Sequence, residues 1–467
     1  MSGDDTPIAA RLAEFTSGLR AGSLPQAVRD DARRRLEDTV GVCLAGSRLD
    51  YAPIVAGLAG EQGGAPQAHT IGFGQQLPAP LAGFVNAALA HGPDYDDTHS
   101  LAMVHISCLV VPAALAMGEL VGASGAEVAV AMVAGAEVGL RIGAAAPHRF
   151  HLRGLHATGI MGPFAAAATG ARVLGLDASQ TANALGLAGS QAAGLRQSSQ
   201  DGSWVKRLHP AWAVQSGLTA ALLAARGFTG PRAVIEGSSG LYAAMLHGEP
   251  VETGRVTEAL GERWFYPETV FKPYPNGAWN HSSMDGVMAI MRREGLGHAD
   301  VARIDVTVPM ECMPAVCEPR DARIHPRTPY HMKFSLPYSV ALLAVNGSVD
   351  VDDYNEETHA NPVIADFAAR VFCHADDGMS PAQFPAIVRV TTRSGAVHEE
   401  SIAAQRGGPL NPMTGAEHRA KFMSNAAPSL GADRAAELWE ELEGVWEAVD
   451  VRQMLRRASG GADGGAG

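Results

Sequence analysis

The stretch from His91 to Pro112 constrains most strongly how this chain can fold. It reads HGPDYDDTHSLAMVHISCLVVP, and its first fifteen residues hold three carboxylates, one threonine and three histidines: Asp94, Asp96, Asp97, Thr98, His91, His99 and His105. Apolar helical sequence flanks these polar residues, with FVNAALA before them and LVVPAALAMGEL after them. Because isolated buried charge is very costly, the polar groups must pair with one another, bind a metal, or line a cleft.

From the residues alone, three interpretations of this stretch stay open. His91, Asp94, Asp97 and His99 are metal-type ligands, since hard divalent ions favour carboxylates and zinc favours histidine. Alternatively, crowded carboxylates raise one another's pKa, which suits proton transfer near neutral pH. The third interpretation is structural, with the acids capping helix ends or pairing with arginine and lysine. If the stretch lines a cleft, we expect Asp94 to matter more than Asp96, because alternate neighbours should turn away from one pocket.

Composition and charge exclude several functional classes. The 467 residues suffice for one large domain or for two to three ordinary ones. Hydrophobic residues make up 46% and charged residues 18%, which is ordinary for a soluble globular protein. The net charge of −13 argues against nonspecific nucleic-acid binding. It also requires that an anionic substrate meet a locally positive pocket.

The cysteines and the N-terminal residues indicate a cytoplasmic protein. Five cysteines are odd in number and scattered, which suggests reduced thiols rather than a disulfide framework. The first residues, MSGDDTPIAARLAEF, lack the basic-then-apolar order of a signal peptide. No apolar run reaches the roughly 18–20 residues that a membrane span needs. We therefore expect no membrane partner.

Helical periodicity dominates the first part of the chain. Apolar spacing predicts helices over residues 7–20, 24–46, 51–60, 81–91, 108–146 (two helices), 157–175, 178–194 and 208–227. Ser124 and Glu127 form a predicted capping box between the two helices of 108–146. The Ala- and Gly-rich helices after His156 should pack closely, deep in a helical core. PRAVIEGSSGLYAAM suggests one further helix, and HTIGFGQQLPAP a short strand or extended connector.

The sequence texture changes at about residue 270. FKPYPNGAWN predicts a linker, followed by a helix (281–295), a strand (ARIDVTVPMEC), two helices (KFSLPYSVALLAVNG and NPVIADFAARVFCH) and a hairpin (386–402) with its turn at Ser394-Gly395. We expect a mainly α protein with a large all-helical domain formed by both chain ends and a smaller α/β (α+β) lid domain. The predicted parts are a helical domain (1–270), the α+β lid (271–402), a C-terminal helical return (403–458) and a flexible tail (459–467). The return contains the last two predicted helices, EHRAKFMSNAA and RAAELWEELEGVWEAV.

Two lysines and several histidines outside the central stretch are candidate site residues. Lys206 lies in DGSWVKRLHP and Lys272 in FKPYP, and the alternative for each is a solvated surface lysine. Lys272 is better placed, because it lies at the predicted junction of two domains, where sites are common. His156 precedes a small-residue helix and His281 opens the helix after the linker. The alternative for both is a capping or core histidine, and His209 before Pro210 would only shape the turn.

At these residues the chain resembles the MmgE/PrpD family, which includes 2-methylcitrate dehydratase, cis-aconitate decarboxylase and iminodisuccinate epimerase. The resemblance extends over about residues 8–455, and the long middle segment around Lys206 makes it specific. It rests on AHGPDYDDTHS with His105 beyond it, GLHATGIMGPFAAAATGARVLGLDASQTANALGLAGSQAAG, DGSWVKRLHPAWAVQSGLTAALLAARGFTGP, FKPYP followed by His281, and KFSLPYSVALLAVNG.

The resemblance implies a fold, an assembly and a set of site residues. It implies an active site between a helical domain and a lid, in a homodimer that uses no metal and no organic cofactor. The implied catalytic residues are Asp94, His105, His156, Lys206 and Lys272. The implied substrate-binding residues are Thr98, His281 and Tyr338.

Two departures from the family pattern mean that the identity of the substrate cannot be inferred from the resemblance. Asn276 and Gly277 stand where the decarboxylase-like branch has a further histidine, which argues against cis-aconitate decarboxylation. The short spacing between Thr98 and His105, with Ile106 where proline is common, differs from the longer insert of the enterobacterial 2-methylcitrate dehydratases.

The chemistry shared by the family is proton transfer at carbon next to a carboxylate. Such a carbon is a very weak acid, so the developing enediolate needs positive groups, and Lys206 and Lys272 fit that role. The acid/base is His105 or His156. Our leading hypothesis is a cofactor-independent hydro-lyase for a small di- or tricarboxylate, similar to 2-methylcitrate dehydratase. The alternatives are an iminodisuccinate-like epimerase, a cis-aconitate-type decarboxylase, and a catalytically silent homologue that binds carboxylates.

Overall fold

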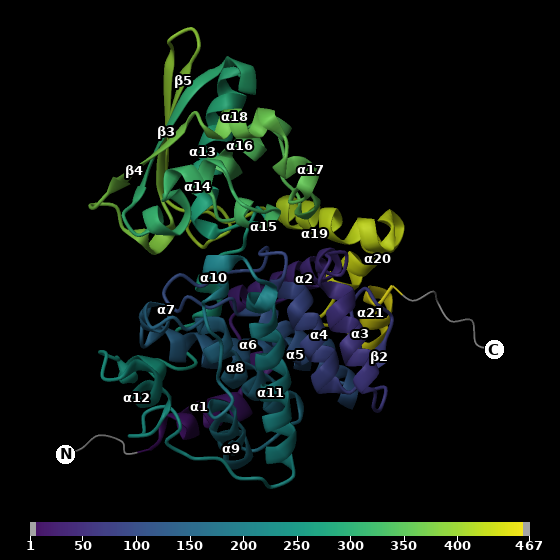
Figure 1. The fold of residues 1–467 in the computed structure, drawn as a ribbon. Helices are drawn as coiled ribbons and strands as arrows, with labels where there is room; N and C mark the ends of the chain where they lie inside the picture. The colour runs from purple at the N-terminus through teal and green to yellow at the C-terminus, as the bar shows by residue number, and fades with distance from the viewer. Residues whose placement is uncertain (1–5, 461–467) are drawn as a thin grey trace. The chain divides into compact units, whose positions relative to one another are not determined.

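The computed structural model describes residues 6–460, and its contacts divide the chain into two compact units. Within the described residues, the helical unit comprises residues 6–92, 96–269 and 415–460, and the α+β unit comprises residues 93–95 and 270–414 (Figure 1). The protein is mainly helical with small sheets, as predicted. Of the predicted tail, residues 461–467 lie outside the described part. No helix among the described residues combines the length and the apolar character needed to cross a membrane.

The helical unit confirms most of the helices predicted from apolar spacing. Its helices are α1 (Ile8–Gly18), α2 (Gln26–Gly46), α3 (Ala52–Gln62), α4 (Ala79–His91), α5 (Ser107–Val121), α6 (Gly125–Ala144), α7 (Arg149–Leu152), α8 (Ala157–Val173), α9 (Ala178–Gly189), α10 (Ser198–Asp201), α11 (Leu208–Ala225), α12 (Leu241–Leu246), α19 (Gly415–Leu430), α20 (Ala432–Glu443) and α21 (Arg452–Ala458). A two-stranded hairpin, β1 (Ala68–His69) with β2 (Gln76–Leu77), lies before α4. The predicted capping box is confirmed: Glu127 N–H donates to Ser124 Oγ at 3.3 Å, and Ser124 N–H donates to Glu127 Oε2 at 2.8 Å.

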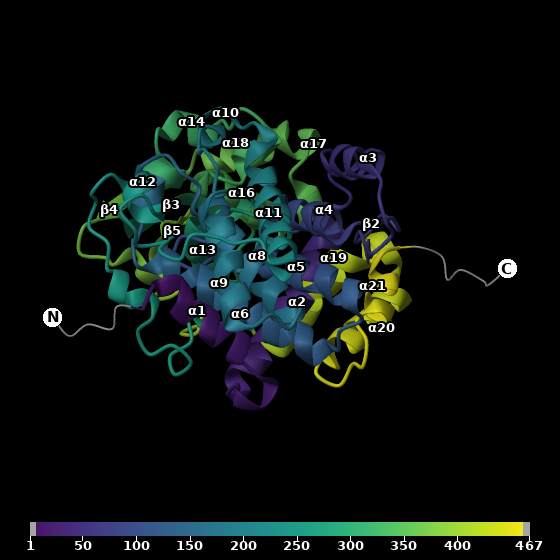
Figure 2. The same ribbon diagram turned by 90° about the horizontal axis from the view of Figure 1, so that it is seen from below.

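Small residues allow α6, α8 and α11 to pack closely at the centre of the helical unit (Figures 1 and 2). A Cβ atom added to Gly135 of α6 would lie 2.6 Å from the carbonyl oxygen of Ala165 in α8. One added to Gly217 of α11 would lie 2.6 Å from the carbonyl oxygen of Pro163 in α8. Both distances are too short for any side chain, so glycine at these positions sets the helix separation. This close packing brings the start of α8 near the start of α11.

The α+β unit is built on a four-stranded sheet in the order β4-β3-β5-β6. Its strands are β3 (Val301–Pro309), β4 (Val371–Asp376), β5 (Ala386–Thr392) and β6 (Val397–Ile402), and its helices are α13 (His281–Glu294), α14 (Arg320–Ile324), α15 (Pro329–Met332), α16 (Leu336–Asn346), α17 (Glu356–His359) and α18 (Pro362–Ala368). β3 runs parallel to β4 and antiparallel to β5. Every second residue of β5 is buried, and α13 packs on β5 and β6. The predicted hairpin of β5 and β6 is confirmed.

Three predicted elements differ from the structure. The helix predicted for NPVIADFAARVFCH is wrong in its second half, because α18 ends at Ala368 and Val371 begins β4. Val371 pairs with Ile304 of β3, so a long-range ladder overrides the local helical pattern. The helix predicted for PRAVIEGSSGLYAAM is confined to α12, and the last predicted helix stops at Glu443.

The α+β unit continues past the predicted boundary at residue 402, as far as Thr414. Gln405 N–H donates to the Gln383 carbonyl at 2.8 Å, and Phe271 N–H donates to the Gly407 carbonyl at 2.9 Å. These main-chain bonds attach residues 403–414 to the α+β unit, although these residues belong to no strand.

A buried ion pair attaches the C-terminal helices to the rest of the helical unit. Lys421 Nζ of α19 lies 2.7 Å from Asp38 Oδ1 of α2, and both side chains are at most 5% exposed. The aromatic rings of Phe422 and Trp439 pack beside this pair with their centroids 5.2 Å apart.

We predict that Lys421→Met destabilises the protein by about 3–5 kcal/mol, because it leaves the Asp38 carboxylate buried without its cation. Chemical unfolding followed by circular dichroism measures this loss. The double variant Lys421→Met/Asp38→Asn should recover part of the stability. A single variant as stable as wild type would show that the pair is not needed to dock α19.

Candidate active site

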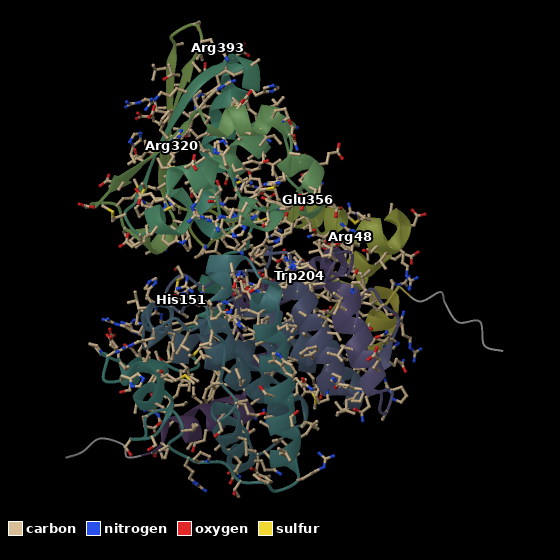
Figure 3. The ribbon with its side chains drawn as sticks, in the orientation of Figure 1. Arg48, His151, Trp204, Arg320, Glu356 and Arg393 are labelled. Atoms are coloured by element: carbon tan, nitrogen blue, oxygen red, sulfur yellow. The ribbon has the colours of Figure 1, made fainter. Side chains whose placement is uncertain are left out.

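Five imidazole rings gather in the helical unit, and we call them the histidine cluster. They come from the end of α4, the residue before the α5 N-cap, α7, the N-cap of α8 and the first turn of α11, in the order His91, His105, His151, His156 and His209. The ring centroids of His91 and His105 are 4.9 Å apart, those of His91 and His156 are 5.6 Å apart, and those of His156 and His209 are 5.1 Å apart. His151, labelled in Figure 3, stacks on His156 at 6.1 Å.

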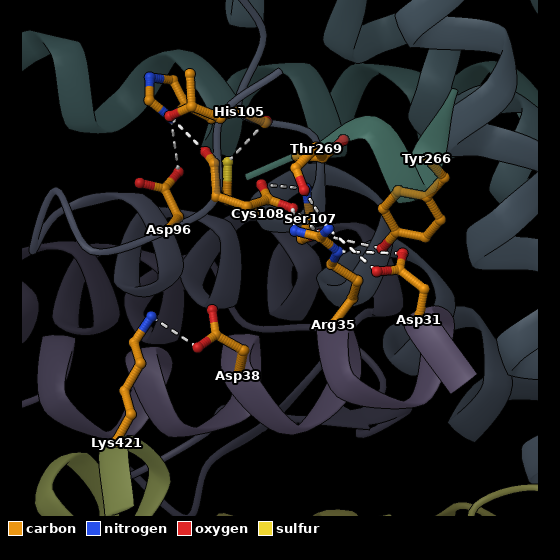
Figure 4. A network of polar contacts seen from close by, with 12 residues as sticks. Asp31, Arg35, Asp38, Asp96, His105, Ser107, Cys108, Tyr266, Thr269 and Lys421 are labelled. Carbon is orange, nitrogen blue, oxygen red and sulfur yellow. Dashed lines mark hydrogen bonds and ion pairs between the residues drawn. The ribbon is translucent and has the colours of Figure 1, made fainter. Parts of the chain in front are cut away.

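The contacts of His105 determine which of its nitrogens can accept a proton (Figure 4). His105 Nδ1 lies 2.7 Å from the Asp97 carbonyl oxygen, and a carbonyl oxygen only accepts. Nδ1 therefore carries the proton, and the lone pair of the neutral ring lies on Nε2. Thr98 Oγ1 lies 3.2 Å from the same Nδ1. His105 is thus oriented as a base that acts through Nε2.

Asp96 joins two rings of the histidine cluster. Its Oδ2 lies 2.7 Å from His91 Nδ1 and 3.6 Å from His105 Nδ1, and its side chain is 1% exposed. A carboxylate here stabilises positive charge on either ring. We expected Asp96 to turn away from the site, and the structure instead places it in the cluster. The segment between α4 and α5 is irregular, so simple alternation does not describe its side chains.

His156 and His209 share a proton position and are held in the neutral form. Their Nδ1 atoms lie 2.9 Å apart, so only one of the two can carry a proton there. Burial lowers the pKa of His156 well below its ordinary value, and the charges of His91 and Lys206 lower it further. Burial likewise lowers the pKa of His209 to about 4. Near pH 7 His156 is therefore a neutral hydrogen-bonding group.

Lys206 lies beside the histidine cluster, in the short 3₁₀ turn η2 (Trp204–Arg207) that leads into α11. Its positive charge contributes to the lowered pKa of His151, His156 and His209. Lys206 is half-buried, so it is not a solvated surface lysine. The helical unit thus places the charge of Lys206 near His156, and it places Thr98 Oγ1 3.2 Å from His105 Nδ1.

Asp97 and His99 have structural partners instead. Asp97 Oδ2 lies 3.1 Å from Arg35 Nη1, and Ser107 donates to the same carboxylate (Figure 4). Burial raises the pKa of Asp97 to about 6, against the opposing effect of Arg35. His99 stacks on Phe265 with the centroids 5.9 Å apart, and burial lowers its pKa to about 3. For these two residues the structural interpretation of the sequence fits best.

One group of side chains has a spacing that suits a metal ion. Among the described residues, His91, Asp96 and His105 place one ligand atom each within 4.8 Å of one another. His91 Nδ1 is hydrogen-bonded to Asp96 Oδ2, and His105 Nδ1 donates to a carbonyl. The same three residues can therefore serve acid/base chemistry as they stand, and a metal bound through either Nδ1 would replace these hydrogen bonds.

In the α+β unit, Asp94 and Lys272 lie together. Residues Pro93–Tyr95, which we call the strap, belong to this unit although their chain neighbours belong to the helical unit. Lys272 Nζ donates to the Asp94 carbonyl at 3.0 Å, and both residues are 2% exposed. The Tyr95 hydroxyl donates to the Pro273 carbonyl at 3.1 Å. Lys272 is buried and is not a surface lysine.

The remaining predicted residues of the α+β unit contact its own interior. His281 Nδ1 lies 2.8 Å from Gln405 Nε2, and its ring meets Tyr274 edge-on. The Tyr338 hydroxyl donates to the Thr358 carbonyl at 2.9 Å, which joins α16 to α17. Burial raises the pKa of Tyr338 to about 12. The hydroxyl of Tyr338 therefore has a structural partner in this unit.

Sequence reasoning did not assign site roles to Asp96 or His209, and it considered His91 only as a metal ligand. One signal in the sequence pointed to His209: Lys206 and His209 are three residues apart at a helix start, a spacing that puts both on one face. For Asp96 no local signal was available, because its partner His91 is fixed by the path of an irregular segment.

We predict that His99 destabilises the folded state as the pH falls, because its pKa is about 3 when folded and near 6.5 when unfolded. Between these values the unfolded state binds more protons, so the contribution of His99 to stability is full above pH 6.5 and falls as the pH drops towards 3. The unfolding free energy of wild type relative to His99→Gln should decrease by on the order of 2 kcal/mol between pH 7 and pH 4.5. The variant His325→Gln, which changes an exposed histidine, is the matched control. A constant difference for His99→Gln would contradict its burial as a neutral ring.

Comparisons with known proteins identify the family. The MmgE/PrpD N-terminal domain matches residues 10–254, and the MmgE/PrpD C-terminal domain matches residues 274–448. The chain is 25% identical to the cis-aconitate decarboxylase-like protein oryM of Aspergillus oryzae, over 98% of this chain and 99% of that protein. It is 30% identical to the cis-aconitate decarboxylase of Aspergillus terreus over 64% of this chain and 63% of that protein, and 24% identical to the human cis-aconitate decarboxylase over 97% and 95%. The chain therefore belongs to the MmgE/PrpD family.

Proposed function

We propose that this protein is a lyase that moves a proton at the carbon next to a carboxylate of a small di- or tricarboxylate. It would work as a homodimer, without metal or organic cofactor. The observation that carries the proposal is the histidine cluster beside Lys206, in which His105 presents Nε2 as a base and His156 is neutral. Membership of the MmgE/PrpD family supports the same chemistry.

His105, Asp96 and Lys206 each have a role in this proposal. His105 Nε2 takes the proton from carbon, and the Asp96 carboxylate, 3.6 Å from Nδ1, stabilises the imidazolium that forms. The electron pair of the broken C–H bond enters an enediolate, whose negative charge Lys206 stabilises. In a hydro-lyase this pair then forms a carbon–carbon double bond as the C–O bond breaks. The hydroxide takes a proton from the His105 imidazolium and leaves as water, which restores the neutral base. We also propose that Asp94 and Lys272 of the α+β unit take part in the reaction.

A second candidate is decarboxylation, which the names of the relatives favour. In that reaction the C–C bond to a carboxylate breaks, carbon dioxide leaves, and the remaining carbanion takes a proton. Asn276 and Gly277 argue against it, since they stand where the decarboxylase-like branch has a histidine. The side chain of Asn276 is buried and donates to the Tyr354 hydroxyl at 2.9 Å, so it presents an uncharged amide there.

A panel of 2-hydroxy di- and tricarboxylates and their dehydrated forms tests the reaction type. We predict ultraviolet absorbance from a new double bond with the hydroxy acids, without release of carbon dioxide. Carbon dioxide from an unsaturated tricarboxylate would assign decarboxylation. Deuterium uptake without net conversion would assign an epimerase, and binding without either signal would leave a silent homologue.

We predict that Lys206→Ala and Lys272→Ala each lower kcat/KM by at least about 100-fold, since one lost charge-stabilising donor typically costs on the order of 100- to 1000-fold. Melting temperatures near wild type would show that the loss is chemical. Arg232→Ala, which changes an exposed cation, is the control. Near-wild-type turnover in both lysine variants would remove them from the reaction.

We predict that activity survives exhaustive chelation and is not raised by added divalent ions. The contacts of His91, Asp96 and His105 support acid/base roles without a metal. Metal analysis of the purified protein accompanies the rate measurement. Stoichiometric metal, with activity lost on its removal and regained on its return, would overturn this part of the proposal.

A further inference from the structure

The chain has four lysines, of which three are buried and Lys206 is half-buried. Lys421 pairs with Asp38, and Lys206 and Lys272 belong to the proposed reaction. The fourth, Lys333, is 5% exposed and has no role so far. Burying an ammonium group is costly, so a buried lysine needs interior partners that compensate for its lost hydration.

Lys333 connects three segments of the α+β unit through its ammonium group. Lys333 Nζ donates to the Pro93 carbonyl of the strap and, at 3.1 Å, to the Pro275 carbonyl of the FKPYPNG loop. It also lies 4.3 Å from the centre of the Tyr354 ring, a distance that suits a cation–π contact. The Asn280 side chain donates to the main-chain carbonyl of Lys333 at 3.0 Å, which fixes the backbone from which the lysine extends.

The strap needs such support because its central residue is in an unfavourable conformation. Asp94 has φ = 57°, in the left-handed region that non-glycine residues seldom adopt. A residue held there persists only when its surroundings impose it. Lys333 bonds the carbonyl before Asp94, Lys272 bonds the carbonyl of Asp94 itself, and the hydroxyl of Tyr95 anchors the next residue. Each strap residue is therefore held by a different group of the α+β unit.

We infer that Lys333 is a positioning residue that fixes the strap and, with it, the carboxylate of Asp94. Its effect on turnover rests on the proposed function, and its effect on the strap does not. An ammonium group suits this position because it is compact and has three N–H donors. It can bond two carbonyl oxygens and still face the Tyr354 ring. The guanidinium of arginine is planar and larger, and would reproduce these contacts only in part.

Proteolysis of the full-length protein tests the hold on the strap. Chymotrypsin cleaves after tyrosine, and Tyr95 is only 4% exposed, so cleavage there requires the strap to open. We predict that Lys333→Met speeds cleavage after Tyr95 by about tenfold or more, as expected for losing hydrogen bonds from a charged donor. Mass spectrometry of the fragments identifies the site.

Arg320→Met is the matched control, and Arg320 is labelled in Figure 3. Arg320 also donates to two main-chain carbonyls of the α+β unit, those of Ala369 and Val371, and lies over the Phe372 ring. Among the described residues these contacts do not include the strap, so the loss of Arg320 should leave cleavage after Tyr95 at the wild-type rate. Equal cleavage in Lys333→Met, Arg320→Met and wild type would overturn the inference.

Kinetics on an active substrate give the second measurement. We predict that Lys333→Met lowers kcat by about tenfold or more and changes KM by less than about threefold. It should also shift the pH midpoint of kcat, because the displaced carboxylate of Asp94 takes part in the proposed reaction. A structural role alone would reduce the amount of folded enzyme without moving KM or the midpoint. Lys333→Arg should recover part of both effects, and it replaces Lys333→Met if that variant does not fold. If no substrate is turned over, the proposed function fails, while cleavage after Tyr95 still decides the role of Lys333.

Discussion

The arrangement of the candidate site depends on one buried residue, Asp97, which uses its side chain and its backbone for different purposes. Its carboxylate is bound by Arg35, which also lies 3.1 Å from Asp31, and by Ser107 at the start of α5. This fixes the irregular segment between α4 and α5. With the segment fixed, the carbonyl of Asp97 accepts from His105 Nδ1 and so selects the tautomer in which Nε2 is the base. The ion pair of Arg35 and Asp97 thus determines which nitrogen of His105 is available as a base.

The second condition is the close approach of helices made of small residues. His156 caps α8 and His209 lies in the first turn of α11, so their Nδ1 contact depends on how closely these two helices pack. Glycine at position 217 permits that approach, because a Cβ atom there would overlap α8. Packing in the core therefore sets the His156–His209 contact, and burial in that core lowers the pKa of both rings. A larger residue at position 217 of α11 would push α8 away and alter this contact.

The sequence predicted what depends on local pattern and missed what depends on the path of the chain. Helix spacing, the Ser124 cap and the β5–β6 turn are local, and all three were predicted correctly. β4 was missed because Val371 gains its strand partners from β3, some 65 to 70 residues earlier in the chain. Asp96 was missed for a related reason, since its place beside His91 follows from an irregular segment and from no periodicity. The residues gathered around Lys206 were named from a resemblance; spacing alone left each of them with a structural alternative.

The chain carries a net charge of −13, yet three of its four lysines are buried and Lys206 is half-buried. Arginine supplies the exposed positive charge, and its guanidinium is always protonated and weakly hydrated. An ammonium group responds more to its surroundings, because burial lowers its pKa, as it does for Lys421. A buried lysine therefore places a positive charge, whose pKa depends on its surroundings, beside an anionic group or a main-chain carbonyl. For the proposed carboxylate substrate, such local positive charge would favour binding, although the acidic surface as a whole repels an anion.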